Sequence, residues 1–343
     1  MKKPITIHEI AAMANVSPAT VSRVLSNSNY PVSKELQDKI RRIAKEVNYI
    51  PNRLGKQLKQ KSSTMIAVII PTIINPFYSS VVFGIEEVAR KHNYTVITCN
   101  SLQDPALEEE YIRTIMEIQV KGLIISSISA DKSLLRQSIE HGLNVVAIDQ
   151  FIDEENVCQI KFDYRKGGYL ATKHLLDLGH ERIVYLTSKL DRPSRTSIHS
   201  GYIQAMREAG LDAITEESNS TELETAEHDF AMGKRLVRKV LAKKEQIPTA
   251  MFACNDMMAF GVIHELTEQG YHVPQDISVV GFDGIEFGMM IHPPLTTIKQ
   301  PDYEMGKMAC KILFDKMKGD DLPMYDLVLQ PRLIQRSSAA PLL

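Results

Sequence analysis

The sequence predicts a small all-α module at the N-terminus and a larger α/β body of two lobes, each built on a doubly wound parallel sheet. Capped helical segments occupy residues 6–47, and apolar runs alternate with amphipathic helices from residue 65 onward. A chain of 343 residues also exceeds what one hydrophobic core usually serves. The charge changes at the same boundary. Residues 1–61 hold 12 lysines and arginines against 4 acidic residues, whereas the rest holds 28 against 38. A basic front that can neutralise phosphates is therefore joined to an acidic body.

The front module has the signals of a helix-turn-helix. Thr6 and Glu9 have the Ser/Thr-x-x-Glu spacing of a capping box, so the first helix is expected to begin near residue 7. Ser17 caps a second helix that starts at Pro18, and Ser33 announces a third. A short helix placed closely behind another is how this motif presents side chains to the DNA major groove. We therefore expect double-stranded DNA as a partner.

The second helix is expected to read DNA with its outer face. Helical spacing turns its apolar residues inward: Val21, Val24 and Leu25. The outward residues are then Pro18, Ala19, Ser22 and Arg23. Arg23 is the expected base reader, and a phosphate contact is its alternative. The alternative for Pro18 is that it only starts the helix.

Residues 4–60 resemble the lactose repressor/galactose repressor family, through Ala19-Thr20-Val21-Ser22-Arg23-Val24-Leu25 and Asn48-Tyr49-Ile50-Pro51-Asn52. The resemblance implies a DNA-binding domain over residues 1–51 and a hinge helix over 52–62, in which Leu58 wedges into the minor groove. It also implies a homodimer on a near-palindromic operator. The DNA-binding residues that follow are Thr6, Ser17, Pro18, Ala19, Thr20, Ser22, Arg23, Asn27, Ser33, Asn52, Leu58 and Lys59.

The body, residues 63–343, shows the strand and helix rhythm of two α/β units. Strands are expected at residues 65–70, 95–99, 123–125 and 145–148, then 183–186, 250–253 and 277–282. Helices are expected at residues 80–91, 107–119, 133–141, 168–178, 200–209, 233–242 and 257–269. The tail adds a strand at 296–299, a helix at 302–318 and a last strand at 327–334. Two such units imply a cleft, with ligands at the carboxyl ends of strands.

The family resemblance extends over residues 4–338, through Asn75-Pro76-Phe77-Tyr78, the segment 174–180 and the segment 294–300. It implies a body like that of periplasmic sugar-binding proteins. The first subdomain would hold residues 63–163 and 296–322, and the second would hold 164–295 and 323–343. The effector pocket implied by the resemblance consists of Phe77, Tyr78, Ser126, Asp149, Asp163, Arg192, Ser194, His228, Asn255 and Asp283.

These residue types suit a sugar or a sugar derivative. Carboxylates and amides bind hydroxyl groups, and an aromatic ring covers the apolar face of a sugar. The alternative for Asp149 and Asp283 is a helix cap, and the alternative for His228 is a residue of a surface loop. The family usually has an arginine three residues before the glycine of its Gly-Tyr pair, where this sequence has Ile198 before Gly201. A phosphorylated ligand is therefore less expected, unless Arg192 or Arg195 replaces that arginine.

Other classes of protein lack their signals in this sequence. No apolar run approaches the ~20 residues that span a bilayer, and no cleavable leader is apparent, so we expect a cytoplasmic protein on the bacterial nucleoid. Four scattered cysteines form no C-x-x-C pair, and the nucleotide-binding and H-E-x-x-H motifs are missing. A solute-binding protein of an importer fits the body alone. We expect an effector-responsive repressor that is not an enzyme and carries no cofactor or metal, with a regulatory protein as the alternative to a small effector.

Overall fold

The computed structural model describes residues 5–25, 31–49, 64–150, 152, 154, 157–218, 226–243, 247–319 and 326–342. The chain divides into two compact units, Met1–Ser63 and Thr64–Leu343. The hinge helix expected at 52–62, with Asn52, Leu58 and Lys59, lies outside the described residues, as does Asn27. The first unit is called the headpiece below, and the second is called the body.

The headpiece contains the three helices that the sequence predicts: α1 (Ile7–Ala14), α2 (Pro18–Leu25) and α3 (Lys34–Glu46). Their inward residues form one small core, in which Ile10, Val21 and Ile40 are fully buried. The capping box is present at the start of α1, and Asn15 ends that helix in the left-handed conformation (φ 58°). Asparagine tolerates this conformation better than most residues do, so the chain can turn sharply into α2.

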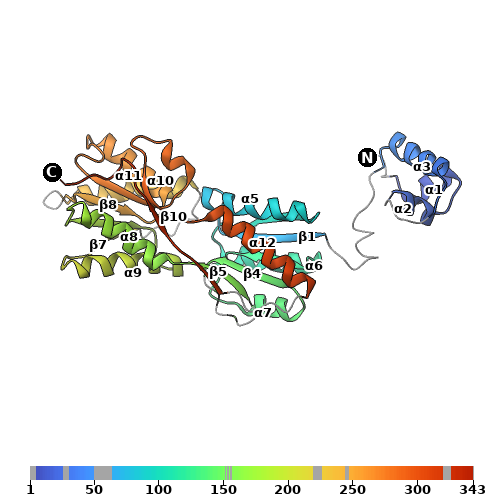
Figure 1. Ribbon diagram of the computed structural model, residues 1–343, viewed down its shortest axis with the longest axis horizontal. Helices are drawn as coiled ribbons and strands as arrows, with labels where there is room; N and C mark the ends of the chain where they lie inside the picture. Colours follow the sequence, from blue (N-terminus) through green and yellow to red (C-terminus); the bar gives the residue numbers. More distant parts are fainter. Residues whose placement is uncertain are drawn as a thin grey trace. The chain divides into compact units, whose positions relative to one another are not determined.

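The first lobe of the body is a six-stranded parallel sheet covered by helices on both faces (Figure 1). Its strands, in the spatial order β11-β5-β4-β3-β1-β2, are β11 (Asp326–Leu329), β5 (Cys158–Phe162), β4 (Asn144–Asp149), β3 (Gly122–Ile125), β1 (Met65–Ile70) and β2 (Thr95–Asn100). Helices α5 (Pro76–Lys91) and α12 (Asp302–Lys318) pack together against one face. Helices α6 (Pro105–Glu117) and α7 (Ser133–Glu140) cover the other, over a separate apolar cluster.

The second lobe repeats this topology. Its sheet has the order β12-β10-β9-β8-β6-β7, with β12 (Arg332–Ile334), β10 (Thr296–Lys299), β9 (Ser278–Asp283), β8 (Ala250–Ala253), β6 (Ile183–Thr187) and β7 (Ile214–Glu217). Helix α8 (Tyr164–Asp177) packs on α9 (Pro193–Glu208), and α10 (Ala226–Leu241) packs on α11 (Asp256–Glu268). A short 3-10 helix, η1 (Glu286–Met289), follows β9. Among the strands that the structure describes in this lobe, β12 alone runs antiparallel to its neighbour. In this doubly wound order, ligands bind where the carboxyl ends of the strands meet.

Three segments cross between the lobes, and two of them differ from the sequence prediction. The strand expected in the first subdomain, β10, lies in the second sheet, paired with β9 and β12. The single strand expected at 327–334 is two strands, with β11 in the first sheet and β12 in the second. Pro331 lies between them, and a proline has no N–H to continue a ladder. The subdomain boundaries expected at 296 and 323 are therefore wrong for these strands, because apolar spacing does not reveal which sheet a strand joins.

The sequence analysis also missed β5 and β7, which are short and carry polar residues such as Lys161 and Glu217. His228, whose alternative interpretation was a surface loop, is instead buried at the start of α10. The polar sequence before it hides the helix start. In the part of the chain that the structure describes, no helix has both the length and the apolar character of a membrane span.

Asp256 is a fully buried carboxylate that fastens the end of β9 to α11. It accepts hydrogen bonds from the Thr297 hydroxyl at 2.5 Å and from the backbone N–H of Ile285 at 2.8 Å. Burial raises its pKa to about 7, although these hydrogen bonds and the positive charge of Arg336 act in the opposite direction. Burial and the charge of Asp256 likewise raise the pKa of Asp283. The folded protein therefore binds protons here that the unfolded chain, with an aspartate pKa of about 3.9, has released.

We predict that Asp256→Asn changes how stability depends on pH. A raised carboxyl pKa means that the parent loses stability as the pH rises from about 4 to about 7, and the variant lacks that loss. Between pH 5 and pH 8, the unfolding free energy of the variant should improve relative to the parent by about 3 kcal/mol. Urea unfolding of both proteins at the two pH values measures this. An equal difference at pH 5 and pH 8 would contradict the buried-acid account.

Candidate DNA interface and interlobe cavity

The outer face of α2 has the composition that the sequence predicts. Ala19, Ser22 and Arg23 are exposed, whereas Val21 and Val24 are buried in the headpiece core. Pro18 and Thr20 are half-buried at the edge of this face. One long cationic side chain thus stands beside small residues on a short helix, so the helix can approach a surface closely. This is the geometry that major-groove reading requires.

Three of the predicted DNA-binding residues serve as helix caps. The Ser17 hydroxyl accepts from the backbone N–H of Thr20 at 3.1 Å and lies 2.9 Å from the Thr20 hydroxyl. Thr6 exchanges hydrogen bonds with Glu9, and the Ser33 hydroxyl accepts from the N–H of Leu36. Capping does not exclude a contact with DNA, because helix N-termini also attract phosphate groups.

A cavity lies between the two lobes of the body, at the carboxyl ends of the strands. Its volume is about 70 Å³, well below the roughly 300–1,000 Å³ of typical ligand pockets. Seven of the predicted effector-binding residues line it: Phe77, Tyr78, Asp149, Arg192, Ser194, Asn255 and Asp283. The cavity is small because polar side chains from the two lobes bind one another across it. A ligand must displace some of these contacts.

The other three predicted residues have different places. Ser126 is fully buried behind Asp149 and donates a hydrogen bond to it at 2.9 Å. Asp163 caps α8 by accepting from the N–H of Lys166 at 2.9 Å, and it is not among the residues that line the cavity. His228 is buried beside the site, but the lining residue is its neighbour Asp229. A helix cap was the alternative considered for Asp149 and Asp283, but the aspartate that caps a helix here is Asp163.

Asp149 collects the hydrogen bonds of the first lobe. Its carboxylate accepts from Tyr78 at 2.8 Å, from Ser126, from the Gln150 amide at 2.8 Å and, at short range, from the Tyr164 hydroxyl. Burial and then the negative charge of Asp149 raise the pKa of both tyrosines, so both remain hydrogen-bond donors at neutral pH. Asp149 also has a positive φ of 64°. Such backbone strain is concentrated at functional sites.

Asp283 is the counterpart of Asp149 in the second lobe, because it ends β9 as Asp149 ends β4. It also has a positive φ, of 112°, and its carboxylate accepts from the amides of Gln300 at 2.8 Å and Asn75 at 3.3 Å. Neither aspartate caps a helix in this structure. The repeated topology has thus placed two buried acidic side chains, each on a residue with positive φ, in the lining of one cavity from opposite lobes.

Besides the hydrogen bond from Tyr164 of α8 to Asp149, three further hydrogen bonds join the lobes at the cavity within the described residues. The Arg192 guanidinium donates to the Gln103 side chain, the Gln150 amide donates to the Ser194 hydroxyl at 3.0 Å, and Asn75 donates to Asp283. In each pair one residue belongs to the first lobe and the other to the second. Each pair also has at least one partner that lines the cavity. Closing the lobes and binding a ligand therefore use the same polar atoms.

Two buried polar atoms of the lining have no hydrogen-bond partner within the described residues: Oε1 of Gln150 and Oδ1 of Asp229. A buried unsatisfied acceptor is costly, typically by about 1–3 kcal/mol. The other oxygen of Asp229 accepts from the Asn255 amide at 2.9 Å. Both orphan atoms accept hydrogen bonds, so the site favours a ligand rich in donors such as hydroxyl groups. The described residues include no cluster of three metal-ligating side chains.

The sequence analysis missed several lining residues: Asn75, Gln103, Gln150, Tyr164, Asp229 and Gln300. Asn75 and Gln150 could have been inferred, because each follows or ends a strand next to a residue that was identified. Tyr164 directly follows one crossover and Gln300 lies in another, and the sequence does not reveal the path of these crossovers. Arg195 and Ile198 lie one turn apart on α9 and both line the cavity. A guanidinium is therefore present near the position where the family usually has its arginine.

Comparison with known proteins places both units in one family. A family profile of bacterial regulatory proteins, lacI family, matches residues 6–52, and a periplasmic binding protein-like domain matches residues 172–339. The ribose operon repressor of Haemophilus influenzae is 32% identical over 97% of this chain and 98% of its own length.

Solved structures agree with this assignment. The lac repressor dimer bound to operator and the anti-inducer ONPF superposes with a TM-score of 0.79 at 28% identity, over 98% of this chain and all of that chain. A LacI family transcriptional regulator from Enterococcus faecium with bound ribose gives a TM-score of 0.73 at 28% identity, over 81% of this chain and all of that one. The chain belongs to the lacI family of bacterial regulatory proteins and is a regulator, not an enzyme.

Proposed function

We propose that the protein is a transcription repressor that binds a near-palindromic operator as a homodimer, with α2 in the major groove and residues 52–62 in the minor groove. A small, neutral polyhydroxylated effector in the interlobe cavity controls its affinity for DNA. Because it acts on DNA, its place is the cytoplasm, on the nucleoid. The observation that carries this proposal is that one chain has both an exposed face of α2 with Arg23 and, in the body, a cavity with unsatisfied hydrogen-bond acceptors.

The effector class follows from the charges and acceptors of the cavity. Asp149, Asp229 and Asp283 contribute three carboxyl groups against the guanidinium groups of Arg192 and Arg195. An anionic ligand would need an excess of positive charge in the lining, which these five groups do not supply, whereas a neutral sugar could donate hydroxyl hydrogens to the carboxyl groups and accept from the arginines. Phe77 offers an apolar ring surface in the same lining. The relatives that concern ribose, one named a ribose operon repressor and one solved with bound ribose, support a pentose.

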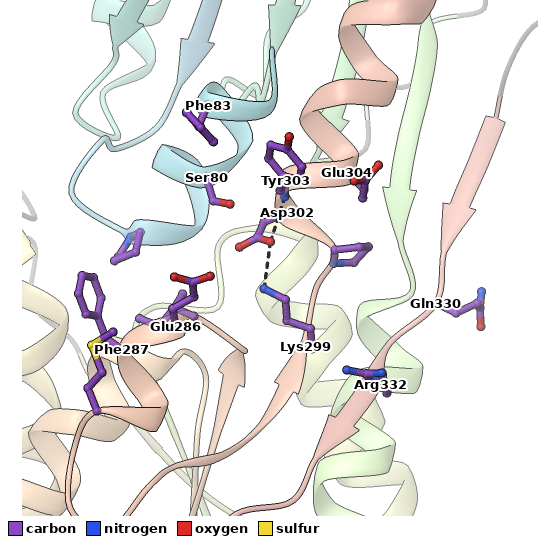
Figure 2. A pocket seen from close by; sticks show the side chains of 14 residues that line it. Ser80, Phe83, Glu286, Phe287, Lys299, Asp302, Tyr303, Glu304, Gln330 and Arg332 are labelled. Carbon is purple, nitrogen blue, oxygen red and sulfur yellow. Dashed lines mark hydrogen bonds and ion pairs between the residues drawn. The ribbon is translucent and has the colours of Figure 1, made fainter. Parts of the chain in front are cut away.

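The homodimer requires a self-complementary face, and we assign it to the groove drawn in Figure 2. A groove of about 850 Å³ runs between the lobes on the outer surface. Figure 2 shows Phe83 and Tyr303 on the first-lobe side, Phe287 and Glu286 on the second-lobe side, and Lys299 reaching Asp302 between them. Phe83, Phe287 and Met290 are 63%, 51% and 68% exposed. An apolar centre flanked by both signs of charge can contact a second copy of itself across a twofold axis.

This face also explains how the lobes could signal. The groove is lined from both lobes, including Lys299 at the end of β10, and from the crossover residues Pro301 and Gln330. A change in the angle between the lobes would therefore change the shape of the face that a partner subunit contacts. Two subunits that contact each other here would shift relative to one another, and with them the spacing of two headpieces on an operator.

We predict that Arg23→Ala reduces sequence-specific DNA binding. Loss of a bidentate guanine contact costs about 1–3 kcal/mol at one operator position, whereas loss of a phosphate contact weakens binding to all sequences alike. The measurement is a gel-shift titration on the operator and on operators altered at single positions. Lys45→Ala, another exposed cation of the headpiece, is the matched control for charge alone. Equal weakening on all sequences by Arg23→Ala would assign this residue to the phosphate backbone.

We predict that a sugar raises the melting temperature of the body and that Asp149→Asn or Asp283→Asn abolishes the effect. Loss of a charge-assisted hydrogen bond costs about 1.5–3 kcal/mol, which corresponds to roughly 10- to 150-fold in affinity. The screen compares D-ribose, other neutral sugars, ribose 5-phosphate and nucleosides, since a ligand of the native state stabilises by mass action.

Asp163→Asn is the matched control for this screen, because asparagine also caps helices and Asp163 lies off the cavity. It should leave the melting shift intact. A loss in Asp163→Asn equal to that in Asp149→Asn would contradict this placement of the site. A preference for ribose 5-phosphate would contradict the neutral class. If no small molecule shifts melting, a regulatory protein acting on the body becomes the controlling partner.

We predict that Met290→Asp converts the dimer to a monomer in sedimentation velocity runs, because it places a charge at the apolar centre of the twofold face. Ile203→Asp is the control, since Ile203 is also an exposed apolar residue (39%) but lies on α9 and does not line the groove. A dimer that survives Met290→Asp and dissociates in Ile203→Asp would place the interface on α9 instead.

A further inference from the structure

Two of the three crossovers carry a polar side chain into the cavity. Tyr164 is the first residue of α8, directly after the crossover from β5, and Gln300 lies in the crossover from β10 to α12. Both are buried, with 7% and 2% of their surface exposed. The segments that must bend when the lobes move are thus in contact with the site where a ligand would bind.

These two side chains link the paired carboxylates into one continuous series of hydrogen bonds. The Tyr164 hydroxyl donates to Asp149 and lies 3.2 Å from the Gln300 side-chain oxygen. The amide nitrogen of Gln300 donates to Asp283 at 2.8 Å. The series Asp149–Tyr164–Gln300–Asp283 therefore runs from the first lobe to the second through two crossovers.

The Tyr164 hydroxyl has one hydrogen and two acceptors. A tyrosine can donate only one hydrogen bond at full strength, so Asp149 and Gln300 compete for it. Without a ligand, the negatively charged Asp149 is the stronger acceptor. Hydroxyl groups of a ligand that bind Asp149 would weaken its hold on Tyr164, and the hydrogen would turn toward Gln300. The link would then have two arrangements, selected by the ligand.

The Tyr164 ring packs against aromatic residues of one strand in each sheet. The ring stacks on Phe282, the penultimate residue of β9, at 6.0 Å and 22°, and meets the edge of Phe162, the last residue of β5, at 5.0 Å and 70°. Gly167, three residues after Tyr164 on α8, packs closely on the Phe282 ring. A Cβ at Gly167 would lie 2.8 Å from that ring, so the Phe282 ring has little room to move by itself. The Tyr164 ring therefore contacts side chains at the ends of strands in both lobes.

We propose that Tyr164 and Gln300 are positioning residues that couple the state of the cavity to the angle between the lobes. The proposal rests on the proposed function, since it explains how an effector in the cavity would reach the dimer face and the headpieces. Tyr164 and Gln300 line the same cavity as Asp149 and Asp283, and their coupling role lies in the hydrogen bonds that they make to these aspartates. Removal of these hydrogen bonds should uncouple the two lobes while both aspartates stay in the cavity.

The test measures the distance between the lobes in the full-length protein. Spin labels are placed at Glu110→Cys on α6 and Arg207→Cys on α9, both exposed, while the native cysteines at 99, 158, 254 and 310 are buried. An excess of unlabelled chain ensures one labelled subunit per oligomer. The variants are Tyr164→Phe, Gln300→Met and the double variant. Tyr202→Phe is the control, because the Tyr202 hydroxyl is also buried but bonds only the backbone of Ile183 and Ile214.

We expect Tyr164→Phe and Gln300→Met each to broaden or shift the distance distribution, and the double variant to change it no further than either single variant. This non-additivity is the mark of one shared link. Tyr202→Phe should lower the melting temperature and leave the distribution unchanged. Single variants that superpose on the parent, or two shifts that add in the double variant, would overturn the proposal. If one single variant does not fold, the other still gives a distribution to compare with the parent.

A gel shift on operator DNA separates this proposal from the proposed function. We expect each single variant to change operator affinity by threefold or more, again without further change in the double variant. If the parent binds no DNA in low salt, the regulator function fails, but the distance measurement still decides whether the link exists. If the parent binds DNA and the variants match it in both affinity and distance, the link alone fails.

Discussion

The body depends on two buried acidic side chains, Asp149 and Asp283, which line the interlobe cavity from opposite lobes. Each ends the fourth strand of its own lobe, each has a positive φ, and each is held by donors from more than one element. Two acidic groups facing one another in a low-dielectric space can coexist only if other groups satisfy or neutralise them. Donors from the strand ends, from the opposite lobe and from the crossovers do this.

This arrangement makes the closed cavity and the ligand competitors for the same atoms. The side chains of Asn75, Gln150 and Arg192 donate hydrogen bonds from one lobe to the other. The same amide and guanidinium groups could instead bind the hydroxyl groups of a ligand. A ligand can shift the lobes only by the difference between its contacts in the two arrangements. Because side chains of the site already make the hydrogen bonds that a ligand would replace, the difference in ligand contacts between the two arrangements depends on where each ligand hydroxyl lies. Specificity for the effector and the size of the allosteric response would then have the same origin.

Much of this structure could be predicted from the sequence, for identifiable reasons. The headpiece was predictable because caps at Thr6, Ser17 and Ser33 fix the helix starts and the apolar spacing fixes the inner faces. The parallel strands were predictable as apolar runs, and the family resemblance supplied ten effector residues, seven of which line the cavity. The placement of β10 and the split between β11 and β12 were not, because pairing between distant segments leaves no local pattern. Tyr164 and Gln300 were missed for the same reason, and His228 was placed one residue from the lining Asp229.

The central claim is that ligand binding in the cavity and operator binding by the headpieces are coupled. Thermodynamic linkage between the two binding reactions tests this claim most directly. The measurement is the affinity of the body's sugar ligand for the free protein and for the same protein saturated with operator DNA, by calorimetry. The account predicts that the two affinities differ, by the same factor by which the sugar changes operator affinity. Equal sugar affinities in the presence and absence of operator would contradict it.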